Sequence, residues 1–204
     1  MANSAQLRNE IAAGKWDDKL RALYGDAAQE ICRQRARYCA ALEQFELYYG
    51  PGRQVHVYSA PGRAELGGNH TDHQRGCVLA AAIDRTTRAR VRLTRSPVVR
   101  VFSRGYDPVT LPLDQLSPRE GERNTSAALV RGMAAAFARR GILWQGFDAW
   151  VESDVLPGSG LSSSAAFEVL LGRIGSALFA GGSLTPVEIA QMAQWAENVY
   201  FGKP

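Results

Sequence analysis

Pro157-Gly-Ser-Gly-Leu-Ser-Ser-Ser-Ala-Ala166 is the most informative stretch of the sequence, because it separates a strand pattern from a helix pattern. Alternating residues before it predict a strand: Phe147, Ala149 and Val151. Apolar residues after it recur at helical spacing and predict a helix: Phe167, Leu170, Leu171, Ile174 and Leu178. A loop in this position directs backbone N–H groups and the positive end of the helix dipole at one point, where an anion can bind.

Glycine and serine make this loop suitable for phosphate. Gly158 and Gly160 allow positive φ angles and a close approach of the backbone to an anion. The three serine hydroxyls at 162–164 can hydrogen-bond a phosphate or supply an oxygen ligand to Mg²⁺. Neither a Walker A sequence nor a GxGxxG dinucleotide fingerprint is present. From the residues alone, a phosphate site is favoured over the alternative of a simple helix cap.

A second group of polar residues follows the first predicted strand, in Ser59-Ala-Pro-Gly-Arg-Ala-Glu-Leu-Gly-Gly-Asn-His-Thr-Asp-His73. Turn-rich loops of this kind carry function more often than they serve packing. His70 and His73 could bind a metal from a helix, but Gly67-Gly68 disfavours a helix here. A surface loop without a role is the other alternative. The favoured ligand is rich in hydroxyl groups, because amide, imidazole and carboxylate groups all hydrogen-bond a sugar.

The chain as a whole predicts an α+β fold in two parts. Residues 1–50 carry apolar residues at helical spacing, namely Leu20, Leu23, Tyr24, Ala27, Ile31, Tyr38, Leu42 and Phe45. Pro51-Gly52 ends this pattern. Short alternating runs then predict strands at 55–57, 77–83, 89–93 and 99–101, and their short connections predict a largely antiparallel sheet. We therefore expect a helical segment at 1–50 and a sheet domain at 51–204.

Two later helices have recognisable boundaries. One is expected to begin at Asn124 or Thr125 and to run towards Gly141 as its C-cap. The other begins with a capping box of Thr185 and Glu188, with a proline at the first helical position. Between the predicted strands, Thr87-Arg-Ala-Arg-Val-Arg-Leu93 alternates arginine with apolar residues, which predicts a strand with its arginines in solvent.

Composition argues against several classes of protein. With 204 residues, 46% of them hydrophobic, the chain can bury one sizeable core. No apolar run approaches the roughly 18 residues of a membrane span, and the first residues lack a secretory pattern, so we expect a cytoplasmic protein without a membrane partner. The net charge of +4 comes from arginines spread along the chain, which disfavours nucleic acid as a partner and would help to attract an anionic nucleotide. The cysteines are expected to be reduced and partly buried: Cys32, Cys39 and Cys77.

Together, the two polar segments resemble the galactokinase branch of the GHMP kinases. Gly62-Arg-Ala-Glu-Leu-Gly-Gly-Asn-His-Thr-Asp72 is similar to the sugar-recognition motif of that branch, and the stretch from Pro157 to Glu168 is similar to its ATP loop. A third stretch, from Ala196-Glu-Asn198 to Pro204, resembles the segment before the catalytic aspartate. The resemblance implies the two-layer N-terminal fold of these kinases (ribosomal protein S5 domain 2-like), with helices mainly on one side of one sheet.

The resemblance also implies an activity and its residues. The activity is ATP-dependent phosphorylation of the anomeric hydroxyl of galactose or a related sugar, with Mg²⁺ as cofactor. Arg63 is similar to the arginine that stabilises the transferring phosphoryl group. Sugar contacts are implied for Asn69, His70, Thr71 and Asp72. Nucleotide contacts are implied for Ser103, Gly158, Ser159, Gly160, Leu161, Ser162, Ser163 and Ser164, and Mg²⁺ contacts for Ser164 and Glu197.

The chain departs from the family pattern in ways that bear on these expectations. Asn69 stands where galactokinases usually have glutamate, and Glu65 where they have asparagine, so the preferred sugar is left open and includes other hexoses and amino sugars. The family's catalytic aspartate and its C-terminal domain would follow Pro204. We therefore expect a truncated domain that is inactive by itself, which sugar-dependent ADP release from this chain would refute. Truncation would also expose apolar surface and so leaves self-association open.

Two other functions were weighed against this one. A non-catalytic sensor of sugar or nucleotide on the same fold is the alternative function. A homoserine kinase is disfavoured, because those kinases lack the His-Thr-Asp loop. The expected partners are therefore a small-molecule sugar and ATP.

Overall fold

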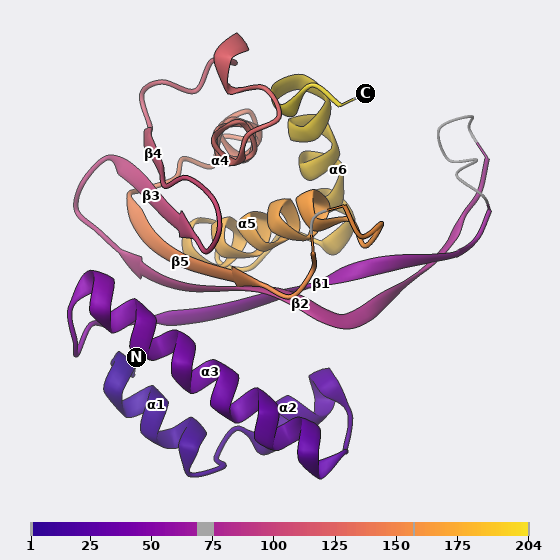
Figure 1. Cartoon of the computed structure of the whole chain (residues 1–204). Coiled ribbons are helices and arrows are strands. Elements are labelled where there is room, and N and C mark those ends of the chain that lie inside the picture. Colours follow the sequence, from indigo (N-terminus) through magenta and orange to yellow (C-terminus); the bar gives the residue numbers. More distant parts are fainter. Residues whose placement is uncertain (1, 69–75, 157, 204) are drawn as a thin grey trace. The chain divides into compact units, whose positions relative to one another are not determined.

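The computed structural model describes residues 2–68, 76–156 and 158–203 of the chain (Figure 1). The chain forms two compact units, Met1–Val57 with Arg90–Arg92 and Tyr58–Ala89 with Leu93–Pro204. None of the helices described is long and apolar enough to cross a bilayer.

The first unit consists mainly of three helices, α1 (Ser4–Ala12), α2 (Asp17–Tyr24) and α3 (Ala28–Tyr49). Eight apolar residues at helical spacing were predicted to face the core of this unit. Six of them are buried: Leu20, Tyr24, Ile31, Tyr38, Leu42 and Phe45. The prediction is wrong for Leu23 and Ala27, which are exposed. Gly25 ends α2 with a φ of +86°, so the helical periodicity does not continue across it into α3.

The strands form one five-stranded sheet in the order β1-β2-β5-β3-β4. Their bounds are β1 (His56–Gly67), β2 (Leu79–Leu93), β3 (Val98–Ser103), β4 (Val109–Pro112) and β5 (Phe147–Ser153). β3 pairs antiparallel with β4 but parallel with β5, where Val101 lies opposite Ala149. The expectation of a largely antiparallel sheet is therefore wrong for β3 and β5. The segment that returns from β4 to β5 contains a helix and is long enough for a crossover.

The first two strands are longer than the sequence predicts. The polar segment expected to be a turn-rich loop from Ser59 onward is instead extended, because β1 continues to Gly67. β1 lies at the edge of the sheet, where the missing N–H of Pro61 is tolerated. The predicted runs at 77–83 and 89–93 belong to one strand, β2. This strand begins at Leu79, so the first residues of the run at 77–83 lie outside it. The described part of the segment that resembles the sugar-recognition motif, residues 62–68, lies at the end of β1 and directly after it.

Two expectations about exposure are wrong. Arg88 and Arg90 are buried rather than in solvent. Within the first unit, the guanidinium of Arg90 lies 5.6 Å from the centre of the Tyr38 ring, a cation–π contact that makes a buried arginine less costly. The three cysteines are free thiols. Cys32 and Cys77 are exposed, and Cys39 is half-buried, so the expectation of partly buried cysteines is wrong for the first two.

In the second unit, three helices lie together on one face of the sheet (Figure 1). They are α4 (Ser126–Ala138), α5 (Ser163–Phe179) and α6 (Pro186–Ala196), and a π-helical turn, η3 (Glu197–Phe201), follows α6 directly. A short 3₁₀ turn, η2 (Glu120–Glu122), precedes α4. The predicted helix starts are confirmed, because Thr125 caps α4 and Thr185 with Glu188 forms the capping box of α6. This arrangement confirms the predicted two-layer fold.

Candidate functional site

The N-cap residue of α5 leaves the start of the helix uncapped. This residue, Ser162, makes no side-chain hydrogen bond to the helix, and the first turn contains no acidic residue. Gly158 and Gly160 have φ angles of +73° and +75°, as predicted, and Ser162 itself has a φ of +58°. A non-glycine residue in this conformation is strained, and such strain is often found at ligand sites. The helix start therefore offers N–H groups and a positive dipole end to an anion.

A cavity of about 620 Å³ adjoins this helix start. Its lining includes the ends of β3 and β5, one residue of β2, the turn after β3, the segment before α4 and the beginning of that helix, the beginning of α5 and the end of η3. This volume is typical of small-molecule sites. The lining residues include Ser103, Tyr106, Asp107, Glu122, Asn124, Thr125, Leu129, Ser153, Val155, Ser163, Ser164, Phe167 and Phe201.

Three of the predicted nucleotide residues line this cavity: Ser103, Ser163 and Ser164. The Ser103 hydroxyl is buried and has no hydrogen-bond partner among the described residues. A buried hydroxyl without a partner is costly, so this one is suited to a ligand. The other predicted members, residues 158–162, lie in the loop that leads into α5 and are absent from the described lining.

Arg63 lies beside the same loop. Its backbone N–H donates a hydrogen bond to the Leu161 carbonyl oxygen, at 3.2 Å. A Cβ atom on the preceding residue, Gly62, would lie 3.0 Å from that oxygen and from Val155, so the glycine permits the close approach. The Arg63 guanidinium lies 3.4 Å from Glu65 and is 42% exposed, which leaves it accessible to a ligand. The structure thus brings the arginine of one motif to the loop of the other.

The predicted sugar residues belong to the segment between β1 and β2. Asn69, His70, Thr71 and Asp72 lie outside the described residues, as does His73. The described residues next to this segment are Gly68, directly after β1, and residue 76, shortly before β2.

The two predicted Mg²⁺ residues are in contact. The Ser164 hydroxyl donates a hydrogen bond to Oε1 of Glu197, at 2.9 Å. Ser164 belongs to the first turn of α5, and Glu197 begins the π-helical turn η3, a type of turn that is frequent at functional sites. Lys203 Nζ lies 3.7 Å from the same carboxylate oxygen. A hydroxyl and a carboxylate are hard oxygen donors, so this pair, beside the start of α5, is chemically suited to Mg²⁺.

Glu168 is a further acidic residue near this pair. It lies one helical turn after Ser164 on α5 and is only 1% exposed. Its Oε1 atom has no hydrogen-bond partner among the described residues. Burial, followed by the negative charge of Glu197, raises the pKa of Glu168 to about 9, while Lys203 opposes this shift. The neutral carboxyl group is thereby favoured in the folded chain.

Several cavity residues were missed by the sequence analysis. Tyr106, Asn124 and Thr125 line the cavity but belong to no recognised motif, and Phe201 lies in the third motif without a role predicted for it. Asn124 has a φ of +60°, a conformation that asparagine tolerates better than most residues. The only available signal was the predicted helix start at Asn124 or Thr125, which says nothing about a ligand.

Comparison with known families identifies two matching regions. Residues 43–93 match the galactokinase galactose-binding signature, and residues 128–204 match the GHMP kinases N terminal domain. A galactokinase of Chloroflexus aurantiacus is 38% identical over 161 residues, which are 78% of this chain and 40% of that protein. A galactokinase of Lactococcus lactis subsp. lactis is 30% identical over 167 residues, which are 80% of this chain and 41% of that protein. The chain thus spans about two fifths of the length of these relatives.

Solved structures show the same fold. The Lactococcus lactis galactokinase complexed with galactose matches 79% of this chain and 42% of its own, with a TM-score of 0.72 and 29% identity. The Methanococcus jannaschii mevalonate kinase matches 72% of this chain and 47% of its own, with a TM-score of 0.62. Its identity of 17% limits that likeness to the fold.

Proposed function

Because the chain belongs to the galactokinase family and carries the N-terminal domain of the GHMP kinases, we propose that it binds ATP and a hexose for phosphoryl transfer to the anomeric hydroxyl of the sugar. The observation that carries this proposal is the uncapped start of α5, which adjoins a cavity next to the Ser164–Glu197 pair. An anion cradle, a cavity and a pair of hard oxygen ligands are the parts that a nucleotide site needs.

The nucleotide would bind with its base in the cavity and its phosphates at the start of α5. The Ser103 hydroxyl is available to hydrogen-bond the base, because it is buried without a protein partner among the described residues. The N–H groups of the first turn of α5 and the hydroxyls of Ser163 and Ser164 are suited to the phosphates. Because ATP is an intracellular metabolite, this function also favours the cytoplasm as the proposed location.

Ser164 and Glu197 would hold Mg²⁺ beside the phosphates. When bound, the ion would neutralise charge on the β- and γ-phosphate oxygens. Arg63 would stabilise the charge that develops on the transferring phosphoryl group, and the contact of its backbone with Leu161 supports this role. The chain's own contribution is therefore to orient the phosphates and to hold their charge.

The sugar would bind near the end of β1. The galactokinase galactose-binding signature at residues 43–93 supports this assignment. Asn69, His70, Thr71 and Asp72 are the proposed contacts, and galactose is the first choice among hexoses. Because position 69 is asparagine, where galactokinases usually have glutamate, another hexose and an amino sugar are tested as well.

Isothermal titration of this chain with ADP and with galactose tests the proposal. We expect ADP to bind, and we expect Mg²⁺ to tighten that binding. Glu197→Gln should remove most of the effect of Mg²⁺ while leaving ADP binding in EDTA nearly unchanged, because only the ion needs the carboxylate charge. Glucose and galactosamine, titrated in parallel, identify the preferred sugar.

A matched variant controls for general damage to the second unit. Glu120→Gln changes an exposed glutamate of the same unit that does not line the cavity, and it should bind ADP and Mg²⁺ as the original chain does. A folded chain that binds neither ADP nor any of these sugars would contradict the proposed function.

A further inference from the structure

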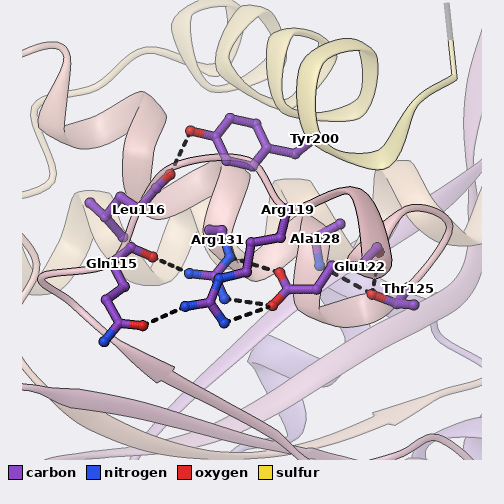
Figure 2. Close-up of polar contacts among 8 residues, drawn as sticks. All are labelled: Gln115, Leu116, Arg119, Glu122, Thr125, Ala128, Arg131 and Tyr200. Carbon is purple, nitrogen blue, oxygen red and sulfur yellow. Dashed lines mark hydrogen bonds and ion pairs between the residues drawn. The ribbon is translucent and has the colours of Figure 1, made fainter.

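A buried arginine of α4 holds the segment that precedes this helix. Arg131 is 2% exposed, and its Nε and Nη2 atoms donate to the two carboxylate oxygens of Glu122, at 2.7 and 2.6 Å. Its Nη1 atom donates to the carbonyl oxygen of Gln115. Figure 2 shows the guanidinium between these two partners. One side chain therefore fixes both ends of residues 115–122, with the bidentate geometry that arginine provides.

A tyrosine of η3 holds the same segment from a second side. The Tyr200 hydroxyl donates to the carbonyl oxygen of Leu116, at 2.7 Å, and the tyrosine is 6% exposed (Figure 2). Nearby, the Asn124 N–H donates to the carbonyl oxygen of Phe201, at 3.1 Å. Residues 115–124 are thus tied to the π-helical turn as well as to α4.

The two anchors meet at a tightly packed contact. A Cβ atom on Gly132, the residue after Arg131, would lie 2.8 Å from the Cβ of Ala196 and 3.1 Å from that of Tyr200. The glycine therefore lets α4 approach the end of α6 and Tyr200 of η3 more closely than alanine would allow. This contact leaves η3 little freedom to move relative to α4.

The held elements are parts of the proposed nucleotide site. Residues 115–124 supply Glu122 and Asn124 to the cavity lining. The π-helical turn supplies Phe201 to the same lining and carries Glu197, the proposed Mg²⁺ ligand. Any loosening of Arg131 or Tyr200 would therefore displace cavity wall and metal ligand together.

From these contacts we propose that Arg131 and Tyr200 are positioning residues of the nucleotide site, which keep the 115–124 wall and the turn bearing Glu197 in one arrangement. The inference rests on the proposed nucleotide-binding function. It adds Arg131, which lies outside every motif recognised in the sequence, and Tyr200, which lies in the third motif but has no role predicted for it there. Neither residue lines the cavity.

Arg131 has an electrostatic effect in addition to its contacts. The hydrogen bonds from Arg131 lower the pKa of Glu122, so this carboxylate is ionised where it lines the cavity. Its charge would repel an anionic nucleotide if no cation were paired with it. Arg131 is almost fully buried and pairs with this carboxylate. Arg119, 3.6 Å from Glu122, provides a second positive charge.

The first test variant is Tyr200→Phe, which removes one hydroxyl and keeps the ring. ADP affinity is measured by calorimetry in EDTA, so that no metal contributes. We expect ADP to bind about three- to tenfold more weakly, the effect of one lost hydrogen bond. Hydrogen exchange on the ligand-free chain should become faster in residues 115–124 and 197–201 but not in the core of α5.

The second variant, Arg131→Lys, keeps a positive charge but cannot bind Glu122 and Gln115 together. We expect it to weaken ADP binding more than Tyr200→Phe does, because it loosens the wall at two points. Two control variants of matched chemistry change residues that do not line the cavity. Tyr24→Phe removes the contact of a buried tyrosine hydroxyl with Tyr38 in the first unit, and Arg140→Lys alters the pair with Glu188.

The outcomes separate this inference from the proposed function. If the controls lower the melting temperature as much as Tyr200→Phe does and only Tyr200→Phe weakens ADP, the positioning role stands. If Tyr200→Phe binds ADP as tightly as the original chain, the role is overturned. If the original chain does not bind ADP, the proposed function fails, and hydrogen exchange alone decides whether Tyr200 holds the segment.

Discussion

At the scale of single residues, Glu168 is the most unusual part of the site. A buried carboxylate without a hydrogen-bond partner is costly, and a protonated carboxyl group is much less so. The Glu168 carboxyl group lies one helical turn from Ser164 and interacts electrostatically with Glu197. Its protonation state therefore also affects Ser164 and Glu197, the proposed Mg²⁺ ligands. Its protonation should therefore be visible in the stability of the chain.

We predict that Glu168 makes the folded chain less stable as pH rises. Its pKa is about 9 in the folded chain and near 4.5 when unfolded, so the folded chain binds more protons between these values. The contribution of the protonated Glu168 to the free energy of unfolding is fully present below about pH 4.5 and is lost progressively as pH rises towards 9. Urea unfolding in EDTA from pH 5.5 to 8.5 should show this decline in the original chain and a weaker decline in Glu168→Gln.

Glu120→Gln serves as the control for this prediction, because Glu120 is 81% exposed in the same unit. It should show the same pH dependence as the original chain. Parallel curves for the original chain and Glu168→Gln across the whole range would contradict the proposed protonation of Glu168.

The sequence predicts individual backbone conformations only where the residue type restricts them. Gly158 and Gly160 were expected to take positive φ because glycine does so without cost, and both do. Ser162 and Asn124 also take positive φ, but nothing in their residue types requires it. Their conformations come from the surrounding packing, which a local pattern does not contain.

At the scale of elements, α6 shows how well a helix start can be predicted. Thr185 accepts a hydrogen bond from the Glu188 N–H at 3.3 Å, and the Glu188 carboxylate accepts one from the Thr185 N–H at 2.9 Å. Pro186 occupies the first helical position, where its missing N–H costs nothing. All three residues are local in sequence, so a sequence pattern is sufficient to identify them.

We predict that Thr185→Ala destabilises the second unit by about 1 kcal/mol, the usual cost of removing an N-cap side chain. Hydrogen bonds from Thr185, followed by Arg140, lower the pKa of Glu188 to about 2, so the cap is stabilising above about pH 4.5 and weakens as pH falls towards 2. Urea unfolding at pH 7 and pH 3 measures both effects.

The difference between original chain and Thr185→Ala should be larger at pH 7 than at pH 3. Thr185→Ser keeps the hydroxyl and is the matched control, with little expected loss at either pH. An equal loss for the alanine and serine variants would show that the hydroxyl contributes nothing.

The alternation of residues in a strand does not identify the strand that pairs with it. The alternation of residues 147–151 predicts a strand, but it does not identify β3 as the parallel partner of β5. Arg88 and Arg90 have the alternation of a surface strand and are nevertheless buried, because burial depends on what covers a strand face. In the same way, nothing in the sequence indicates that Arg131 is buried, because its partners, Gln115 and Glu122, are known only from the structure.

At the scale of the whole molecule, the sequence was sufficient to indicate the fold and the family. Two motifs far apart in the sequence meet where Arg63 contacts Leu161, and this contact is consistent with their joint role in phosphate binding. The cavity itself could not be predicted, because its walls come from β3, β5, α5 and η3 and from a segment without a motif. Such a site depends on the tertiary arrangement.

The net charge of +4 gives a prediction at this scale. A positive protein should accelerate the arrival of an anionic nucleotide, and salt should screen this attraction. We expect the association rate constant of ADP, measured by stopped-flow in EDTA, to fall about three- to tenfold between 50 and 500 mM KCl. Dissociation should change much less, because contacts within the site are screened less than the long-range field.

Adenosine is the control, since it has the same base and ribose but no charge. Its association rate constant should be nearly independent of salt. If adenosine and ADP respond to salt equally, the net charge does not steer the nucleotide. If salt changes only the dissociation of ADP, attraction is confined to the start of α5 and the arginines elsewhere serve the fold.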